Sequence, residues 1–256
     1  MQALTQAEIL SSSTFTAASG TVRFVMTSKF QPVLDKQLKT PPPPASSGTT
    51  RRNRLEGVGP QLLEEYRRAG GAARTIFELP DKPTDAQIIS VLSAWLGELE
   101  TRWPGEESSG REMARLMIVR TLGHKTSRKS TAIPALITQF DHAKILSERT
   151  RWAAGNALYD IPAGKEYFDD LATIATDRAF GRSRGMVVTW LGKSRHPDAT
   201  TVALGLIDDE SVEGNALEAL AKMRVQGARK QIEPFLNSPK ARIRQLAKRI
   251  LDHDQS

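Results

Sequence analysis

The residues that could hold a metal ion or carry out acid–base chemistry are few and scattered. The four histidines are far apart, and none lies at helical spacing from a glutamate or from another histidine: His124, His142, His196 and His253. The chain has no cysteine, which excludes disulfides, zinc–thiolate sites, iron–sulfur clusters and cysteine nucleophiles. We therefore predict no metal site and no cofactor.

Nucleophilic and phosphate-binding motifs are also missing from the sequence. There is no Gly-x-Ser-x-Gly stretch and no phosphate loop. The segment Gly181–Gly185, with sequence GRSRG, lies at a predicted helix start, where backbone amides could hold an anion. A helix N-terminus capped by Ser183 or a neighbour is the simpler interpretation. We predict no catalytic residue and a protein that is not an enzyme.

Arginine recurs at a regular spacing in the second half of the chain. It opens four of five eight-residue copies of one pattern, at Arg115, Arg151, Arg184 and Arg244, and the remaining copy opens with Glu213. The first positions are 36, 33, 29 and 31 residues apart, and every copy ends in leucine. Such a period indicates a solenoid whose units bury their apolar faces only by stacking. The arginine column could form a phosphate-binding stripe or an internal ladder.

The elements that position this column are predicted to be helices. Positions one, four and eight of each copy fall at i, i+3 and i+7, which places them on one buried stripe. Second apolar runs follow at residues 132–140, 167–175, 200–207 and 231–236, each preceded by turn residues such as Pro162 with Gly164, His196-Pro197-Asp198 or Gly227. The sequence predicts an all-α fold, an alpha–alpha superhelix of about five helical hairpins.

The pattern Arg-x-x-Ala-x-x-x-Leu, followed by glycine in Leu122-Gly123 and Leu191-Gly192, resembles the short HEAT repeats of bacterial HEAT-repeat domain proteins, a kind also found in phycobilisome lyases. The resemblance covers roughly residues 111–252. It implies that each column arginine pairs with an acidic turn residue of a neighbouring unit, and four candidates are available: Asp141, Asp177, Asp208 and Asp209. Asn156 and Asn215, in matching Gly-Asn-Ala-Leu stretches, are expected to bond backbone between units.

Two other members of this broad class set the alternatives. Alkylpurine DNA glycosylases of HEAT-like fold use a tryptophan and an aspartate near the lesion, and the matching candidates are Trp152, Trp190, Tyr159 and Asp160. Packing explains Trp190 equally well, because its column is otherwise small or apolar. A phycobilin lyase would need a bilin pocket, for which the sequence shows no sign.

The composition and the charge distribution limit the kinds of partner that the protein can have. The 256 residues are 39% hydrophobic and contain no run of about 18 apolar residues, so we expect a soluble, cytoplasmic protein. The net charge is +5 over residues 1–54, −5 over 55–110 and +7 over 111–256. An ordinary solvated surface accounts for this distribution, but a basic solenoid could also attract an anionic partner, either an acidic protein surface or a nucleic acid.

We predict three regions along the chain. Residues 1–54, rich in Ser, Thr and Pro and including Pro41–Pro44, have the composition of a basic disordered tail, and Met26 is a plausible natural start that would make the first 25 residues dispensable. Residues 55–110 are predicted to form an N-terminal helical cap, and residues 111–256 the repeat solenoid.

A protein-binding scaffold is the function that such an array suggests. We expect its contact surface on the second helices of the hairpins and on the turns beside them. The candidate contact residues are basic: Lys129, Lys144, Lys165, Arg178, Arg195, Arg229 and Lys230.

Overall fold

The computed structural model describes residues 15–17, 20–22, 59–161 and 163–254. The chain divides into two parts, residues 1–51 and 52–256. In the first part, strands β1 (Phe15–Ala17) and β2 (Gly20–Val22) pair antiparallel, with Phe15 opposite Val22. The rest of the expected tail, with the proline run and Met26, lies outside the described residues. The second part is helical and holds every predicted repeat.

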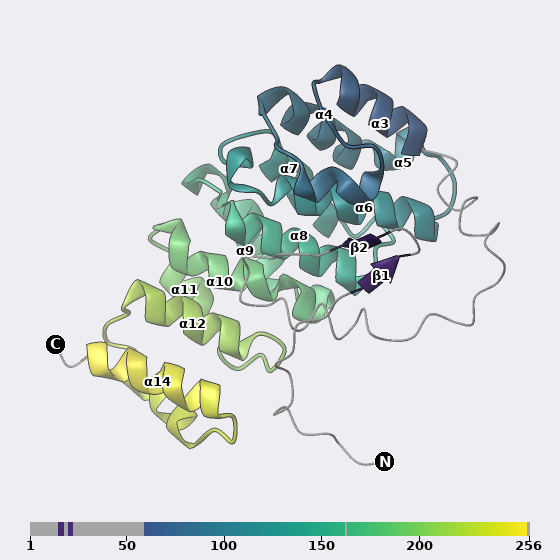
Figure 1. Ribbon diagram of the computed structural model, residues 1–256. Coiled ribbons are helices and arrows are strands. Elements are labelled where there is room, and N and C mark those ends of the chain that lie inside the picture. The colour runs from purple at the N-terminus through teal and green to yellow at the C-terminus, as the bar shows by residue number, and fades with distance from the viewer. Residues whose placement is uncertain (1–14, 18–19, 23–58, 162, 255–256) are drawn as a thin grey trace, which may run out of the picture. The chain divides into compact units, whose positions relative to one another are not determined.

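The ladder helices, as we call the helices that carry the five repeat copies, follow one another through the stack (Figure 1). They are α6 (Ser109–Leu122), α8 (Glu148–Asp160), α10 (Gly185–Ser194), α12 (Glu213–Met223) and α14 (Ala241–His253). Each packs on the next along the sequence of repeats. Serine caps two of them, because the Ser108 side chain accepts from the Arg111 amide and Ser147 from the Thr150 amide.

The outer layer consists of the shorter helices between them. It contains α7 (Ala132–Ile137), α9 (Phe168–Thr176), α11 (Ala199–Leu204) and α13 (Arg229–Ile232). Short 3-10 helices complete the connections: η2 (Lys125–Ser127), η3 (Thr138–Phe140), η4 (Lys165–Tyr167), η5 (Arg178–Arg184) and η6 (Glu233–Asn237). Two layers of helices that alternate along the chain make this a helical-repeat solenoid, the fold class predicted from the periodicity.

Residues 59–103 form the helices that precede the first clear repeat. They are α3 (Gly59–Arg68), η1 (Ile76–Asp81), α4 (Ala86–Gly97) and α5 (Leu99–Arg102). Asp85 caps α4 by accepting from the Ile88 amide. One hydrophobic core runs without interruption from Leu62 of α3 to Leu251 of α14. These first helices therefore share their core with the repeats.

Close contacts at glycine show that neighbouring ladder helices run parallel and in register. A Cβ on Gly185, near the start of α10, would lie 2.9 Å from Oδ1 of Asn215, near the start of α12. At the other end of the same helix, a Cβ on Gly192 would lie 2.9 Å from the carbonyl oxygen of Ala219. The N-terminal ends of the ladder helices thus form one edge of the stack, and the C-terminal ends form the opposite edge.

Candidate binding surface and the arginine edge

Each of the four column arginines donates a hydrogen bond to the segment that precedes its ladder helix. We call these four arginines and the groups that they bind, at the N-terminal ends of α6, α8, α10 and α14, the arginine edge. Arg151 donates to the carbonyl oxygens of Lys144 and Leu146 at 2.7 and 3.0 Å, and its guanidinium lies 5.4 Å from the ring centroid of Phe180. Arg244 is exposed and donates to the carbonyl oxygens of Ser238 and Pro239.

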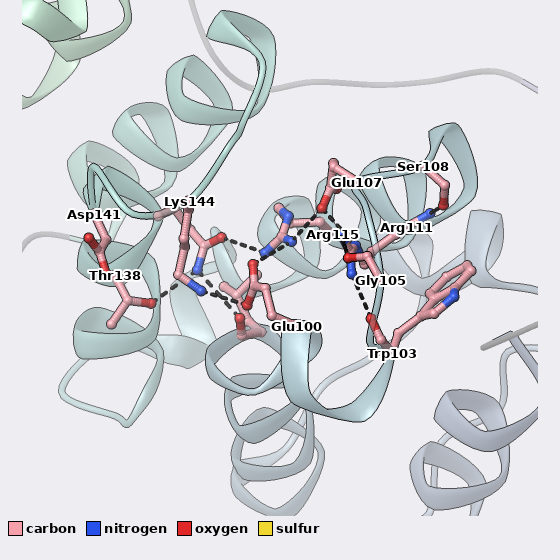
Figure 2. A network of polar contacts seen from close by, with 12 residues as sticks. Glu100, Trp103, Gly105, Glu107, Ser108, Arg111, Arg115, Thr138, Asp141 and Lys144 are labelled. Atoms are coloured by element: carbon pink, nitrogen blue, oxygen red, sulfur yellow. Dashed lines mark hydrogen bonds and ion pairs between the residues drawn. The ribbon is translucent and has the colours of Figure 1, made fainter.

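Arg115 is completely buried at the junction of the first helices and the repeats. Figure 2 shows its guanidinium between two carboxylates, Glu100 of α5 and Glu107, at 2.7 and 3.2 Å. Its other terminal nitrogen donates to Oε1 of Gln139 at 3.0 Å. Arg115 therefore joins η3 and the turn before α6 to α5.

The carboxylate of Glu100 is shared between two cations. Its second oxygen accepts from Lys144 Nζ at 2.7 Å. Burial raises the pKa of Glu100, but the hydrogen bond from Lys144 and the charge of Arg115 outweigh it and lower that pKa. Lys144, a candidate contact residue by sequence, is thus largely buried in an internal ion pair.

Arg184 plays the equivalent part in the middle of the array, and it too has no exposed surface. It donates to the carbonyl oxygen of Ala175 in α9 and to Oδ2 of Asp209, both at 2.5 Å, and to Ser211 Oγ at 3.1 Å. Hydrogen bonds from Ser211 and then Arg184 lower the pKa of Asp209 to about 2, although burial opposes them. One arginine thus joins α9, α10 and the turn before α12.

The four aspartates expected to pair with the column arginines have different contacts. Asp209 pairs with a column arginine, whereas Asp177 accepts from His142 Nε2 at 2.6 Å and Asp141 offers Arg151 only its carbonyl oxygen. Asp208 is exposed. Glu213, in the arginine position of its copy, pairs with Lys240 of the following unit, so the charges there are reversed. With Arg115 and Arg184 fully buried, the column does not form an exposed phosphate stripe.

The candidate contact residues do not gather on one surface. Lys144 and Arg178 lie in the turns at the arginine edge, and the other five lie in the turns and on α13 at the opposite edge. Arg178 is exposed, 3.5 Å from Asp209, and Arg229 pairs with Glu233. Lys129 and Arg195 have positive φ, both 55°, and Arg195 is the C-cap of α10, where a cation suits the helix dipole. The second helices α7, α9 and α11 contain no lysine or arginine at all.

The residues of the glycosylase alternative are separated by burial. Trp190 is fully buried beside Phe168, with 6.3 Å between the ring centroids. Trp152 and Tyr159 are half-buried and Asp160 is exposed, all on α8. Of the two asparagines, Asn215 donates to the Thr189 hydroxyl at 2.8 Å, so the expected bond to backbone is wrong for it. Asn156 is buried, and its Oδ1 has no partner among the described residues.

A different group of side chains on the ladder helices is half-buried or exposed, and we call it the α8–α12 surface. It comprises Arg149, Trp152 and Tyr159 of α8, Lys193 of α10 and Lys222 of α12. The three α8 residues stand at i, i+3 and i+10, which places them on one helix face. Lys193 Nζ donates to the Tyr159 carbonyl oxygen at 2.8 Å, and Lys222 Nζ donates to the Tyr159 hydroxyl at 2.7 Å.

The cations of this surface are less fully paired than those of the arginine edge. Arg149 is half-buried, its Nε is shielded from solvent, and within residues 59–161 and 163–254 it has no hydrogen-bond or ion-pair partner. Lys193 forms no ion pair with any described carboxylate. Lys222 pairs with Glu218, whose carboxylate also binds Arg242. The residues the sequence missed could have been found by aligning the copies, since Lys193 and Lys222 occupy the same position after the repeat leucine.

Comparisons with known proteins add little beyond this geometry. No protein-family model matches the chain, and no curated protein does. Among solved structures, the chain is similar to a designed armadillo repeat protein, with a TM-score of 0.44 and 17% identity over 79% of this chain and 97% of that one. No helix in the described part of the chain has the length and apolar character needed to span a bilayer.

Proposed function

We propose that the chain is a non-enzymatic, HEAT-like binding scaffold that holds an acidic, extended segment of a protein partner on the α8–α12 surface. The observation that carries the proposal is the half-buried Arg149, which has no partner among the described residues. A cation that is partly removed from water without a counter-charge is costly, and a carboxylate from a partner would supply charge-assisted hydrogen bonds. The HEAT assignment and a cytoplasmic location are parts of this proposal.

The aromatic side chains support a protein partner. Trp152 and Tyr159 are half-buried on the same helix face as Arg149, and tryptophan, tyrosine and arginine are the residues that dominate binding energy at protein interfaces. Three of the four outer helices offer no comparable site, because α7, α9 and α11 have no lysine or arginine and α9 exposes Asp169 and Asp170. In the fourth, α13, Arg229 already pairs with Glu233. An acidic segment is therefore expected on the ladder helices.

The spacing of the cations sets the length of that segment. Arg149 precedes Tyr159 by ten residues, which corresponds to about 15 Å along an α-helix. An extended peptide advances about 3.3 Å per residue, so acidic side chains about five residues apart would reach Arg149 and Lys193 together. An apolar residue between them would face Trp152.

Selection from a random-peptide display library tests the proposal without a known partner. The full chain is expected to select peptides with two acidic residues about five positions apart. Fluorescence anisotropy should then show at least a tenfold loss of affinity in the double variant Arg149→Gln, Lys193→Gln. Lys125→Gln, which removes an exposed lysine of η2, is the matched control and should bind normally.

Nucleic acid is the competing outcome of the same experiment. Labelled double-stranded and single-stranded DNA are titrated at about 50 and 200 mM salt. Micromolar binding that falls roughly a thousandfold between these concentrations would indicate about six or more phosphate contacts. That result, together with no selection of acidic peptides, would overturn the protein-scaffold proposal.

A further inference from the structure

Two lysines from neighbouring ladder helices converge on the ring of Tyr159. Lys193 Nζ lies 3.3 Å from the ring centroid, and Lys222 Nζ lies 4.7 Å from it. The two ammonium groups are therefore less than about 8 Å apart. Like charges this close repel each other, and a conformation that brings them together needs a cause in the packing.

The cause is the close approach of α10 to α12 at Gly192. The position of a Cβ there would be only 2.9 Å from the carbonyl oxygen of Ala219 and 3.0 Å from its Cα. Only glycine allows these two backbones to touch at that point. Lys193 is the next residue along α10, and Lys222 follows Ala219 by three residues, so the contact holds the backbone segments that carry the two lysines close together.

Carboxylates near this pair do not balance its charge. Glu218 pairs with Lys222 at 3.1 Å but is shared with Arg242, which is 2.6 Å away. Asp160 attracts Lys193 without forming an ion pair with it. Burial first, and then the charge of Lys222, lower the pKa of Lys193. The cluster thus keeps one cation without a carboxylate partner among the described residues.

The hydrogen-bond donors left over in the cluster indicate which anion fits. Each ammonium has three N–H groups and each tyrosine one O–H. Lys193 uses donors on the Tyr159 carbonyl and ring, and Lys222 uses donors on the Tyr159 hydroxyl and Glu218. Each lysine then retains one donor, and the hydroxyl, which accepts from Lys222, retains its own proton. Three donors match the three terminal oxygens of a phosphomonoester, whereas a carboxylate has only two oxygens.

We infer that Tyr159, Lys193 and Lys222 form a subsite for a phosphomonoester carried by a phosphorylated side chain of the partner. The subsite deepens the proposed function, on which it rests, by naming the group bound at the C-terminal edge of the surface. Arg149, about 15 Å away along α8, takes a carboxylate of the same segment. Phosphorylation of the partner would then strengthen its binding to the scaffold.

Calorimetric titration of the full chain with small phosphates tests this subsite separately from peptide selection. The probes are N-acetyl-phosphoserine amide, inorganic phosphate and N-acetyl-glutamate amide, at about 50 mM salt. We expect phosphoserine amide to bind at least tenfold tighter than the glutamate compound. Its affinity should rise from pH 5.5 to 7.5, because the second ionisation of the phosphate has a pKa of about 6.

Variants show whether the binding belongs to this cluster. Lys193→Gln and Lys222→Gln should each lower phosphoserine affinity at least fivefold, and Tyr159→Phe about threefold, with unchanged thermal unfolding. Lys125→Gln, at an exposed lysine of η2, is the control. The assignment would be overturned by equal binding of the glutamate compound, by binding of inorganic phosphate alone, by equal losses in Lys125→Gln, or by no binding at all. Acidic peptides would still be selected in those cases if the proposed function holds.

Discussion

The arginine edge and the α8–α12 surface use the same kinds of side chain under opposite conditions of solvation. At the arginine edge, Arg115 and Arg184 are fully buried and each has a carboxylate within 2.7 Å. On the α8–α12 surface, Arg149 is half-buried and Lys193 is exposed, and neither has a carboxylate ion-pair partner among the residues described. Removing one member of a buried ion pair strongly lowers the free energy of unfolding, whereas exposed charges contribute little to it. We therefore assign the buried arginines to stabilising the helical stack and the surface cations to binding a partner.

The largest expected effect comes from Arg184. Replacing Arg184 with methionine should lower the free energy of unfolding by about 3 to 5 kcal/mol, because it leaves the Asp209 carboxylate without its buried partner. Urea unfolding followed by circular dichroism measures the change. Arg244→Met is the matched control at the equivalent, exposed position and should cost less than about 1 kcal/mol. Equal losses in the two variants would show that burial does not distinguish these arginines.

Two glycines of the ladder helices differ in the room that they leave for a side chain, and alanine substitutions test that difference. Gly192→Ala should lower the free energy of unfolding by about 1 to 3 kcal/mol, because its new Cβ would lie 2.9 Å from the carbonyl oxygen of Ala219. Gly214→Ala should instead raise the free energy of unfolding by about 0.5 kcal/mol. Its Cβ would meet only Ile243 Cδ1, at 3.4 Å, and alanine favours the helix more than glycine does. Thermal unfolding of both variants tests the sign. A loss of stability in Gly214→Ala would contradict the described spacing of α12 and α14.

Acid should weaken the arginine edge through Asp209. Its pKa is lowered from 3.8 to about 2, so the folded state binds this proton less readily than the unfolded chain does. The stabilisation is fully present above about pH 4 and is lost as the pH falls to about 2. In Asp209→Asn, the free energy of unfolding should therefore fall less steeply between pH 4 and pH 2 than in the wild type. Asp208→Asn, in the same turn but exposed, should keep the wild-type slope.

The repeat helices could be predicted from the sequence because one apolar stripe and one leucine recur in every copy. The partners of the buried arginines could not. Glu100 and Glu107 precede the first copy and belong to no repeated pattern, and Lys144 reaches Glu100 across 44 residues. The sequence does not show whether a basic residue in a turn is exposed to solvent or forms an ion pair with a carboxylate far away in the chain. For that reason the candidate contact residues were predicted by charge alone and are divided between two edges in the fold.

The α8–α12 surface was within reach of the sequence only in part. Trp152 and Tyr159 are candidates by sequence, but for a glycosylase comparison that also uses the buried Trp190. Lys193 and Lys222 follow the repeat leucine by two residues in successive copies, and parallel helices in register bring such residues together. That register became visible only from the contacts at Gly185 and Gly192.

The central claim is tested most directly by comparing the free energies of unfolding of two variants in urea. One is the triple variant Arg149→Gln, Lys193→Gln, Lys222→Gln, which removes three charges from the α8–α12 surface; the other is Arg184→Met. We predict that the triple variant stays within about 1 kcal/mol of the wild type, while the single variant loses about 3 kcal/mol or more. A triple variant that loses as much as Arg184→Met would mean that the surface cations hold the fold, and it would contradict their assignment to binding.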